Sequence, residues 1–332
     1  MTGQKSVSVV IPVFNELENT PLMHRELSDV LQDCGREYEM IFVDDGSSDG
    51  TAGVLQQIAS EDARVKVIFF RRNYGQSAAM LAGMQHASHD YVVTIDGDLQ
   101  NDPDDIPMFL QKLDEGYDLV HGWRKQRQDK LISRKIPSVV ANWLISKSTG
   151  FPIHDLGCTL KALRREIASQ IELYGEMHRF IPILAHQLGA NSIEVVTHHR
   201  ARQFGTTKYG IGRTTGVLLD LLTVKFLTKY MSSPMKLFGR LGMWVGVLAV
   251  LSVISTVLMK LIGGIDMTGN PLLLLGAISA ILGVQFFSLG FLGEMSIRIY
   301  FSNENNSPYQ IREQINFGEG DDPVILPIRK AA

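Results

Sequence analysis

Two carboxylates separated by one glycine, Asp96 and Asp98, follow a short apolar run with the composition of a buried β-strand. Successive side chains of a strand point to opposite faces, so Asp96, Asp98 and Gln100 would share one side at the carboxyl end of this strand. Oxygen ligands there suit Mg2+ or Mn2+, ions that keep further coordination sites for water and substrate phosphates. The motif therefore predicts a site for diphosphate chemistry, with these three residues as metal-binding candidates.

The same triplet also fits an ordinary Asx-type turn, and the sequence alone leaves both interpretations open. A calcium-binding loop of the EF-hand type fits worse. Counted from Asp96, the sixth position is Asn101 rather than glycine, and the twelfth is Pro107 rather than glutamate. An EF-hand is therefore disfavoured.

The triplet lies in a region, residues 1–212, where strand-like and helix-like segments alternate. Strands are expected at 7–13, 39–43, 65–70, 91–95 and 119–121, and helices near 17–33, 51–60, 76–87 and 104–115. This alternation predicts right-handed crossovers and a mostly parallel sheet covered by helices. Ligands of such sheets collect beyond the carboxyl ends of the strands.

Two more of the predicted strands end in clusters of polar residues. The first is followed by Asn15 and Glu16, and the second by Asp44 and Asp45. Each cluster alone could be a turn or a helix cap, but three such clusters at one sheet edge favour a ligand site. The sequence has neither a Gly-x-Gly-x-x-Gly turn after the first strand nor a Gly-Lys-Ser/Thr phosphate loop, which disfavours dinucleotide oxidoreductases and Walker-type NTPases.

The composition narrows the class of protein further. A formal net charge of -3 over 332 residues gives no reason to expect a nucleic-acid partner. Two cysteines, Cys34 and Cys158, are too few for a disulfide framework or a zinc site and suit a reducing compartment. The amino terminus lacks a basic region before an apolar core, so no cleaved signal peptide is expected.

Residues 241–259 and 271–292 contain no Asp, Glu, Lys or Arg. Helices of that length match a hydrocarbon core of about 30 Å, which predicts two transmembrane helices. A buried helical hairpin in a soluble domain is the alternative, but both runs exceed the usual length of core helices. Basic residues flank the two apolar runs on the side of the chain ends: Lys225, Lys229, Lys236, Arg240 and Arg298. The positive-inside rule then places the catalytic domain and both termini in the cytoplasm.

These features divide the chain into four parts. We expect a catalytic domain at 1–212, interfacial helices at 213–238, a transmembrane hairpin at 239–300 and a polar C-terminal tail at 301–332. The segment 218–230 is apolar with lysines on one side, which is consistent with a helix in the membrane interface. Packing of this segment on the catalytic domain is the alternative.

The motifs at the three strand ends resemble those of family 2 glycosyltransferases of the GT-A fold. The matching runs are Val-Val-Ile-Pro-Val-Phe-Asn-Glu at 9–16, Val-Asp-Asp-Gly-Ser-Ser-Asp at 43–49 and Asp-Gly-Asp-Leu-Gln at 96–100. Further runs, at 72–76, 98–103, 115–118, 202–209 and 293–300, resemble the polyprenyl-phosphate glycosyltransferases. This branch includes dolichyl-phosphate mannose synthases, bactoprenol glucosyltransferases and the formamido-arabinose transferase. The resemblance covers most of residues 5–300.

The resemblance implies an α/β, Rossmann-like GT-A domain followed by two transmembrane helices. The implied activity is a metal-dependent, inverting transfer of one sugar from a UDP- or GDP-sugar to polyprenyl phosphate, with Mg2+ or Mn2+ as cofactor. It also implies a bacterial inner-membrane location and a homo-oligomer, a tetramer in this family. A processive polysaccharide synthase is disfavoured because a Gln-x-x-Arg-Trp motif and additional membrane helices are missing from the sequence. A membrane-anchored scaffold that binds nucleotide sugar or polyprenyl phosphate without turnover stays open.

The resemblance also implies roles for individual residues. Those expected to bind the nucleotide sugar are Pro12, Phe14, Asn15, Glu16, Asp44, Asp45, Asn73 and Asp96. Those expected to act in catalysis are Asp98, Asp155, Arg202 and Lys208. The acceptor phosphate is assigned to Arg124 and Arg134, because the planar guanidinium suits phosphate. Asp155 is the best acidic candidate in a run, 155–161, that departs from the family's Thr-Gly-x-Phe-Arg. A basic face that attracts anionic lipids is the alternative for Arg127, Lys130 and Lys135.

Overall fold

The computed structural model describes residues 4–125, 153–173, 177–201, 234–266, 268–302 and 308–318, without the side chains of 297–302. Arg134, Arg202 and Lys208, together with the basic residues 127, 130 and 135, lie outside this description. The chain divides into two compact units. The first comprises Met1–Val224 with Ser307–Ala332, and the second comprises Lys225–Asn306.

Within the described residues, the first unit is built on an eight-stranded sheet with the order β7-β5-β6-β4-β1-β2-β3-β8. The strands are β1 (Val7–Val13), β2 (Tyr38–Asp44), β3 (Val65–Phe70), β4 (Tyr91–Thr94), β5 (Leu119–Trp123), β6 (Lys161–Arg164), β7 (Ser192–Val196) and β8 (Ile311–Ile315). All five strands predicted from the sequence are confirmed, with ends shifted by two residues at most.

The sheet is mixed, although four of its seven pairings are parallel. Strands β3, β2, β1 and β4 form a continuous parallel block, and β5 pairs with β7 in parallel. The antiparallel pairings come from β6, which lies between β4 and β5, and from β8, which adds to β3. The parallel block matters most for function, because it brings the carboxyl ends of β1, β2 and β4 to one edge.

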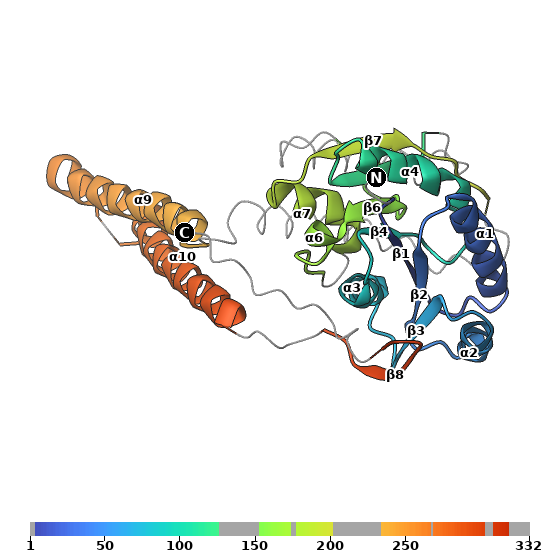
Figure 1. Cartoon of the computed structure of the whole chain (residues 1–332). Helices are drawn as coiled ribbons and strands as arrows, with labels where there is room; N and C mark the ends of the chain where they lie inside the picture. The colour runs from blue at the N-terminus through green and yellow to red at the C-terminus, as the bar shows by residue number, and fades with distance from the viewer. Residues whose placement is uncertain are drawn as a thin grey trace. The chain divides into compact units, whose positions relative to one another are not determined.

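Helices cover both faces of this block (Figure 1). They are α1 (Asn19–Asp33), α2 (Thr51–Glu61), α3 (Gln76–His86), α4 (Ile106–Asp114), α6 (Arg165–Ala168) and α7 (Ile181–Gln187), with 3-10 turns at Pro103–Asp105 and Met177–Phe180. Figure 1 shows α1 and α2 on one side of β1 and β2, and α3 on the other. All seven residues of β1 are buried, as expected of a strand covered on both faces. At Gly83 of α3 a Cβ atom would lie 2.2 Å from Val10 Cγ1, so this glycine lets α3 pack closely on β1.

The polar tail contains one strand that the sequence analysis did not identify. β8 pairs with β3, and Tyr309 just before it stacks on Phe70 with ring centroids 5.0 Å apart. The Tyr309 hydroxyl donates a hydrogen bond to Gln85 Oε1 at 2.6 Å. The chain that follows the hairpin therefore completes the edge of the catalytic sheet.

The second unit consists of two long helices, α9 (Pro234–Gly263) and α10 (Pro271–Ser302). Both are long and apolar enough to cross a membrane, with mean hydropathies of 2.3 and 2.2. Only 17% of each apolar window is buried, so the described helices do not have the burial of a soluble hairpin core. The two predicted apolar runs lie inside them.

Glycines bring the two helices of the hairpin close together. A Cβ atom at Gly242 would lie 3.1 Å from the Gly283 carbonyl oxygen, and one at Gly276 would lie 3.0 Å from Val253 Cγ2. Small residues are the usual means of close helix packing in membranes. The short Gly-x-x-x-Gly motif that begins at Gly242 thus faces α10.

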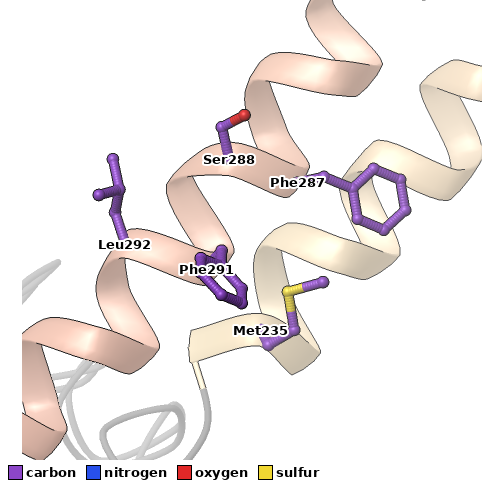
Figure 2. A pocket seen from close by; sticks show the side chains of 5 residues that line it. All are labelled: Met235, Phe287, Ser288, Phe291 and Leu292. Carbon is purple, nitrogen blue, oxygen red and sulfur yellow. The ribbon is translucent and has the colours of Figure 1, made fainter.

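An open, apolar groove of about 400 Å3 lies between α9 and α10 (Figure 2). Met235 of α9 lines it together with Phe287, Ser288, Phe291 and Leu292 of α10. Ser288 donates its hydroxyl to the Val284 carbonyl oxygen at 3.0 Å within its own helix. The lining thus offers mainly apolar contact.

Candidate active site

The three polar clusters found in the sequence meet at one edge of the sheet. β1 pairs in parallel with β2 and with β4, in a register that places Val13 beside Asp44 and Val10 beside Thr94. Asn15 therefore follows β1, Asp44 ends β2 and Asp96 follows β4 at the same edge. This convergence is what the alternating pattern predicted.

The turn that carries Asp96 and Asp98 is fixed by its neighbours on both sides of Gly97. A Cβ atom at Gly97 would lie 2.7 Å from Val13 Cγ1, so only glycine lets the turn pack against β1. Leu99 has a φ of 59° and a fully buried side chain. Such a left-handed conformation is costly for a non-glycine residue and persists where the surroundings impose it, often at functional sites.

Both acidic side chains of this turn are half-buried. Gln76 at the start of α3 donates its amide to Asp96 Oδ1 at 2.5 Å, and the Gln100 backbone N–H donates to Asp98 Oδ1 at 3.2 Å. Burial and the charge of Asp98 raise the pKa of Asp96 to about 6, against the opposing effects of Thr159 and Lys161. The charge of Asp98 disfavours a second negative charge on Asp96, and a divalent cation would relieve this repulsion, so the two carboxyl groups are a donor set that fits Mg2+ or Mn2+.

The loop after β1 is tied to the loop after β2. The Asn15 backbone N–H donates to Ser47 Oγ at 2.8 Å, and its side-chain oxygen accepts from the Ser48 N–H at 2.9 Å. The Glu16 N–H donates to Thr51 Oγ1 at 3.0 Å. Asn15 has a φ of 52°, another strained residue at this sheet edge. Both residues predicted to bind nucleotide thus also hold the two loops together.

Asp45 links the loop after β2 to the loop after β3. Its carboxylate accepts the Tyr74 N–H at 2.6 Å and the Gly75 N–H at 2.9 Å. Gly46 has a φ of 73°, and a Cβ atom there would lie 2.6 Å from the Arg72 carbonyl carbon, so glycine is required for this approach. Asn73, another predicted nucleotide contact, is exposed in the same loop.

The other predicted nucleotide contacts also lie at this edge. Pro12 is a buried residue of β1, and Phe14 follows that strand half-buried. Asp44 is 1% exposed and accepts the Ser47 N–H at 3.1 Å. The structure therefore brings together all the described residues that the sequence analysis assigned to the nucleotide sugar.

We expect Asp45→Asn to change how the stability of the protein depends on pH. Burial raises the pKa of Asp45 to about 6, whereas an unfolded chain has an Asp pKa of about 3.9. Between these values the folded state binds more protons, so this group contributes stability that grows as pH falls from 7 to 4.5. In melting curves recorded in detergent, the wild type should gain melting temperature relative to Asp45→Asn when the pH changes from 7.5 to 5.

Asp49→Asn is the matched control in the neighbouring loop. Burial alone would raise the pKa of Asp49, but hydrogen bonds from Thr51 outweigh this effect and lower it. The stability that the Asp49 carboxylate contributes is therefore lost only at pH values below the usual Asp pKa. The difference in melting temperature between Asp49→Asn and the wild type should stay constant between pH 7.5 and 5. An Asp45→Asn difference that is equally constant would contradict the prediction.

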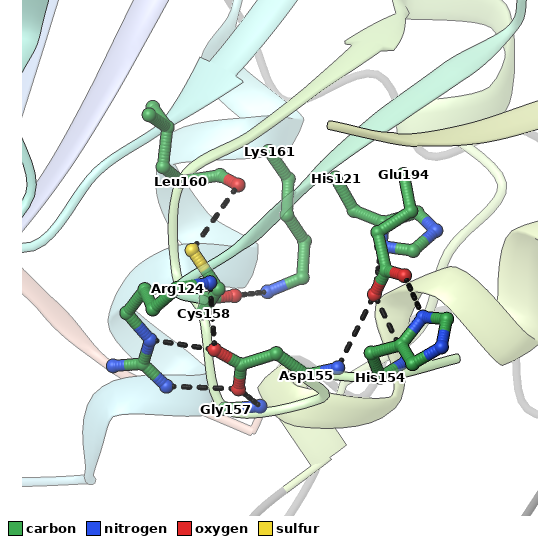
Figure 3. A network of polar contacts seen from close by, with 9 residues as sticks. All are labelled: His121, Arg124, His154, Asp155, Gly157, Cys158, Leu160, Lys161 and Glu194. Carbon is green, nitrogen blue, oxygen red and sulfur yellow. Dashed lines mark hydrogen bonds and ion pairs between the residues drawn. The ribbon is translucent and has the colours of Figure 1, made fainter. Parts of the chain in front are cut away.

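Asp155 and Arg124 form a buried ion pair (Figure 3). Arg124 directly follows β5 and donates its Nε to Asp155 Oδ2 at 2.8 Å and its Nη2 to Asp155 Oδ1 at 3.0 Å. Burial disfavours the guanidinium charge, but the bonds and charge of Asp155 raise the pKa of Arg124 above its usual value. Their side chains are only 5% and 13% exposed, respectively. Asp155, one of the catalytic candidates, and Arg124, one of the acceptor-phosphate candidates, therefore form one structural unit.

Lys161, the first residue of β6, is a buried cation that the sequence analysis did not select. It is 1% exposed, and its Nζ donates to the Cys158 carbonyl oxygen. Burial lowers its pKa to about 8, against the opposing charges of Asp96 and Asp155. Lys161 thus acts electrostatically on both acidic motifs. The sequence offered one sign of this residue. Lys161 ends the 155–161 run, at the place where the corresponding family stretch has a basic residue, Arg.

Arg200 is a second residue that the sequence analysis did not select. Its Nε and Nη2 bind both oxygens of Asp102 at 3.0 and 2.6 Å, and its Nη1 binds Glu26 Oε2 at 2.6 Å. Its backbone N–H donates to the Gln100 carbonyl oxygen at 2.9 Å. The segment that leads to Arg202 therefore starts beside the Asp96–Asp98 turn.

We expect Arg200→Ala to lower the sugar-transfer rate about tenfold, because the segment before Arg202 loses its ionic anchor to Asp102 and Glu26. The measurement is the initial rate at saturating donor and acceptor. Arg36→Ala is the matched control, since Arg36 pairs with Asp114 on α4 and donates to the Lys5 carbonyl oxygen, which precedes the amino end of β1. Equal rates for Arg200→Ala and Arg36→Ala would contradict the prediction.

Comparison with known proteins identifies the family of this domain. Residues 8–172 match the sequence profile of Glycosyl transferase family 2, a region that includes Asp96, Asp98, Arg124 and Asp155. The chain is 40% identical to the dodecaprenyl-phosphate galacturonate synthase of Rhizobium johnstonii. The alignment spans 311 residues and covers 92% of each chain.

Solved structures share the fold of the catalytic domain. Glucosyl-3-phosphoglycerate synthase from Mycobacterium tuberculosis superposes with a TM-score of 0.51 at 20% identity, over 68% of this chain and 80% of that one. Mannosyl-3-phosphoglycerate synthase from Rubrobacter xylanophilus has the same TM-score at 15% identity, over 67% and 74%. The chain thus belongs to glycosyltransferase family 2, as a glycosyltransferase with a GT-A catalytic domain and two apolar C-terminal helices.

Proposed function

We propose that the protein transfers a single sugar, with inversion, from a nucleoside diphosphate sugar to polyprenyl phosphate. The observation that carries this proposal is the relationship to the dodecaprenyl-phosphate galacturonate synthase, which spans 92% of both chains and so includes the apolar hairpin. A lipid acceptor also gives the hairpin a purpose, because it keeps the catalytic domain at the membrane that holds the substrate.

Asp96, Asp98 and Gln100 are proposed to hold Mg2+ or Mn2+. Such an ion, when bound, neutralises charge on the leaving diphosphate. The M. tuberculosis synthase has been solved with Mn2+ and uridine diphosphate, which supports a divalent cation in this fold. Gln76 orients the Asp96 carboxylate toward this role through its 2.5 Å hydrogen bond.

The nucleotide part of the donor is proposed to bind at the ends of β1, β2 and β3. Hydrogen bonds of Asn15 and Asp45 and the close backbone approach at Gly46 hold these loops together, so the proposed contacts are organised before the ligand arrives. The proposed contacts are Pro12, Phe14, Asn15, Glu16, Asp44, Asp45 and Asn73. A UDP- or GDP-sugar fits this assignment equally.

Arg124 and Arg134 are proposed to bind the acceptor phosphate, and Arg202 and Lys208 to neutralise the donor diphosphate. A phosphomonoester has a second pKa of about 6, so the attacking oxygen is already anionic near neutral pH and needs little help from a base. Asp155 has both oxygens bound by Arg124 and is suited to orient that guanidinium toward phosphate. Positioning is then the main task of the protein residues.

The protein is proposed to reside in a bacterial inner membrane as a homo-oligomer, with the catalytic domain and both termini in the cytoplasm. The proposed parts are the catalytic domain 1–212, interfacial helices 213–238, hairpin 239–300 and tail 301–332, of which β8 belongs to the catalytic sheet.

We expect a cysteine at Thr268, in the connection between α9 and α10, to face the periplasm. The basic residues that flank the hairpin on its other side predict this orientation. In intact cells the Thr268→Cys variant should react with a membrane-impermeant maleimide, whereas a cysteine at Lys5 should react only after permeabilisation. The opposite labelling pattern would contradict the proposed topology.

Incubation of the purified full-length protein with radiolabelled UDP- and GDP-sugars and undecaprenyl phosphate tests the proposed function. Transfer of label to the organic phase supports it, and NMR of the product reports whether the anomeric configuration is inverted. Saturable binding of donor and acceptor without a lipid-linked product would favour the scaffold without turnover.

A further inference from the structure

Asp155 is held from two sides, and we propose that Glu194 is the positioning residue on the second side. Arg124 binds the carboxylate of Asp155, and Glu194 binds the backbone that carries it (Figure 3). This inference rests on the proposed role of the Arg124–Asp155 pair in the active site.

One carboxylate oxygen of Glu194 receives two backbone hydrogen bonds. Its Oε1 accepts the His154 N–H at 3.0 Å and the Asp155 N–H at 3.2 Å. Its Oε2 bonds to His154 Nδ1 at 2.6 Å, and the His154 ring stacks on Trp123 with centroids 4.4 Å apart. Glu194 therefore fixes both the backbone and the side chain of the residue before Asp155.

The sheet sets the distance between the two groups that hold Asp155. β7 carries Glu194 and pairs in parallel with β5, in a register that places Glu194 beside His121 and Val196 beside Trp123. Arg124 is the next residue after Trp123. Glu194 on β7 and Arg124 directly after β5 thus bind the same turn from two neighbouring strands, and sites built on such elements have the most precise geometry.

The Asp155 side chain also holds the turn from within, and the Arg124 backbone N–H donates to Asp155 Oδ2 at 3.3 Å. Asp155 Oδ1 accepts the Gly157 N–H at 3.0 Å, which closes the turn on its own side chain. The Glu194 side chain is 13% exposed, and its carboxylate accepts the N–H groups of His154 and Asp155. Removal of that acceptor leaves both N–H groups without it. His154 is exposed, so water can replace the acceptor there, but Asp155 is 5% exposed and its N–H group will find another acceptor only if the turn shifts.

A shift of the turn moves the Asp155 carboxylate and, with it, the guanidinium of Arg124. A small displacement of a positioning group lowers the rate at which the bound substrates react more than it lowers the affinity for the donor. Glu194 should therefore affect kcat and leave the KM for the nucleotide sugar nearly unchanged, because the nucleotide loops lie at the ends of β1 to β3.

Comparison of Glu194→Ala with Glu194→Gln in the full-length protein tests the inference. Alanine removes the acceptor and should lower kcat about thirtyfold, the rate equivalent of leaving the Asp155 amide without its acceptor, with the donor KM within about twofold. Glutamine keeps an amide oxygen for both N–H groups and should lower kcat no more than about fivefold. Glu115→Ala, which removes a surface ion pair with Lys112, is the matched control.

Hydrogen exchange provides a readout that does not depend on activity. The amides of His154 and Asp155 should lose protection in Glu194→Ala and keep it in Glu194→Gln, while peptides from β1 and β2 stay unchanged. If the wild type proves inactive with polyprenyl phosphate, the proposed function fails but this exchange pattern still decides the role of Glu194.

Three results would overturn the inference. The first is a Glu194→Ala rate within about threefold of wild type in an active preparation, which would mean that the anchor is not needed for catalysis. The second is a glutamine variant as impaired as the alanine variant, which would assign the effect to the charge of Glu194 rather than to its acceptor. The third is unchanged exchange at residues 154 and 155.

Discussion

Asp98→Ala abolishes sugar transfer, with an expected loss of about a thousandfold or more, while the protein stays folded. The carboxylate is half-buried at the strand edge, so its removal takes away a proposed metal ligand without opening a cavity in the core. The measurement is the transfer rate over titrations of Mg2+ and Mn2+, together with the melting temperature in detergent.

Asp90→Ala is the matched control for this variant. Asp90 directly precedes the same strand, β4, at the opposite end, where it binds Lys5 and Ser6. It should keep most of the activity. Full turnover by Asp98→Ala at saturating Mg2+ and Mn2+ would remove Asp98 from the proposed metal site.

Asp155→Ala should lower kcat at least about a hundredfold. Arg124 loses the carboxylate that binds two of its nitrogens, and its guanidinium is no longer held in one orientation. Breaking a buried pair by removing one partner costs about 3–5 kcal/mol, so the melting temperature should also fall. The two effects are separable because the rate is measured below the melting transition.

The double variant Arg124→Ala/Asp155→Ala identifies the cause. If Asp155 acts through Arg124, the double variant will be no slower than Arg124→Ala alone, since the two residues form one unit. Additive losses would assign Asp155 a separate role at the reacting atoms. A rate near wild type for Asp155→Ala would move the function to another residue of the 155–161 run.

The sequence by itself determined those features that depend on short stretches of chain. The strand–helix alternation, the two apolar spans and the residues at the three strand ends are contiguous patterns, and the structure confirms the fold that they predict. Parallel strands bring their carboxyl ends to one edge, so the meeting of Asn15, Asp44 and Asp96 followed from order along the chain.

Only the tertiary structure decided which residues act together around Asp155. Arg124 and Glu194 lie 31 and 39 residues away from it, and Arg200 reaches Glu26 across 174 residues. These contacts depend on the insertion of β6 and β7 beside β4 and β5, and on exact register, for which strands of four or five residues carry little local signal. The same holds for Lys161, because only packing determines that a charged side chain at the start of a strand is buried. Local sequence therefore specified five of the eight described strands and the Asp96–Asp98 motif, whereas long-range pairing specified how the charged groups are held.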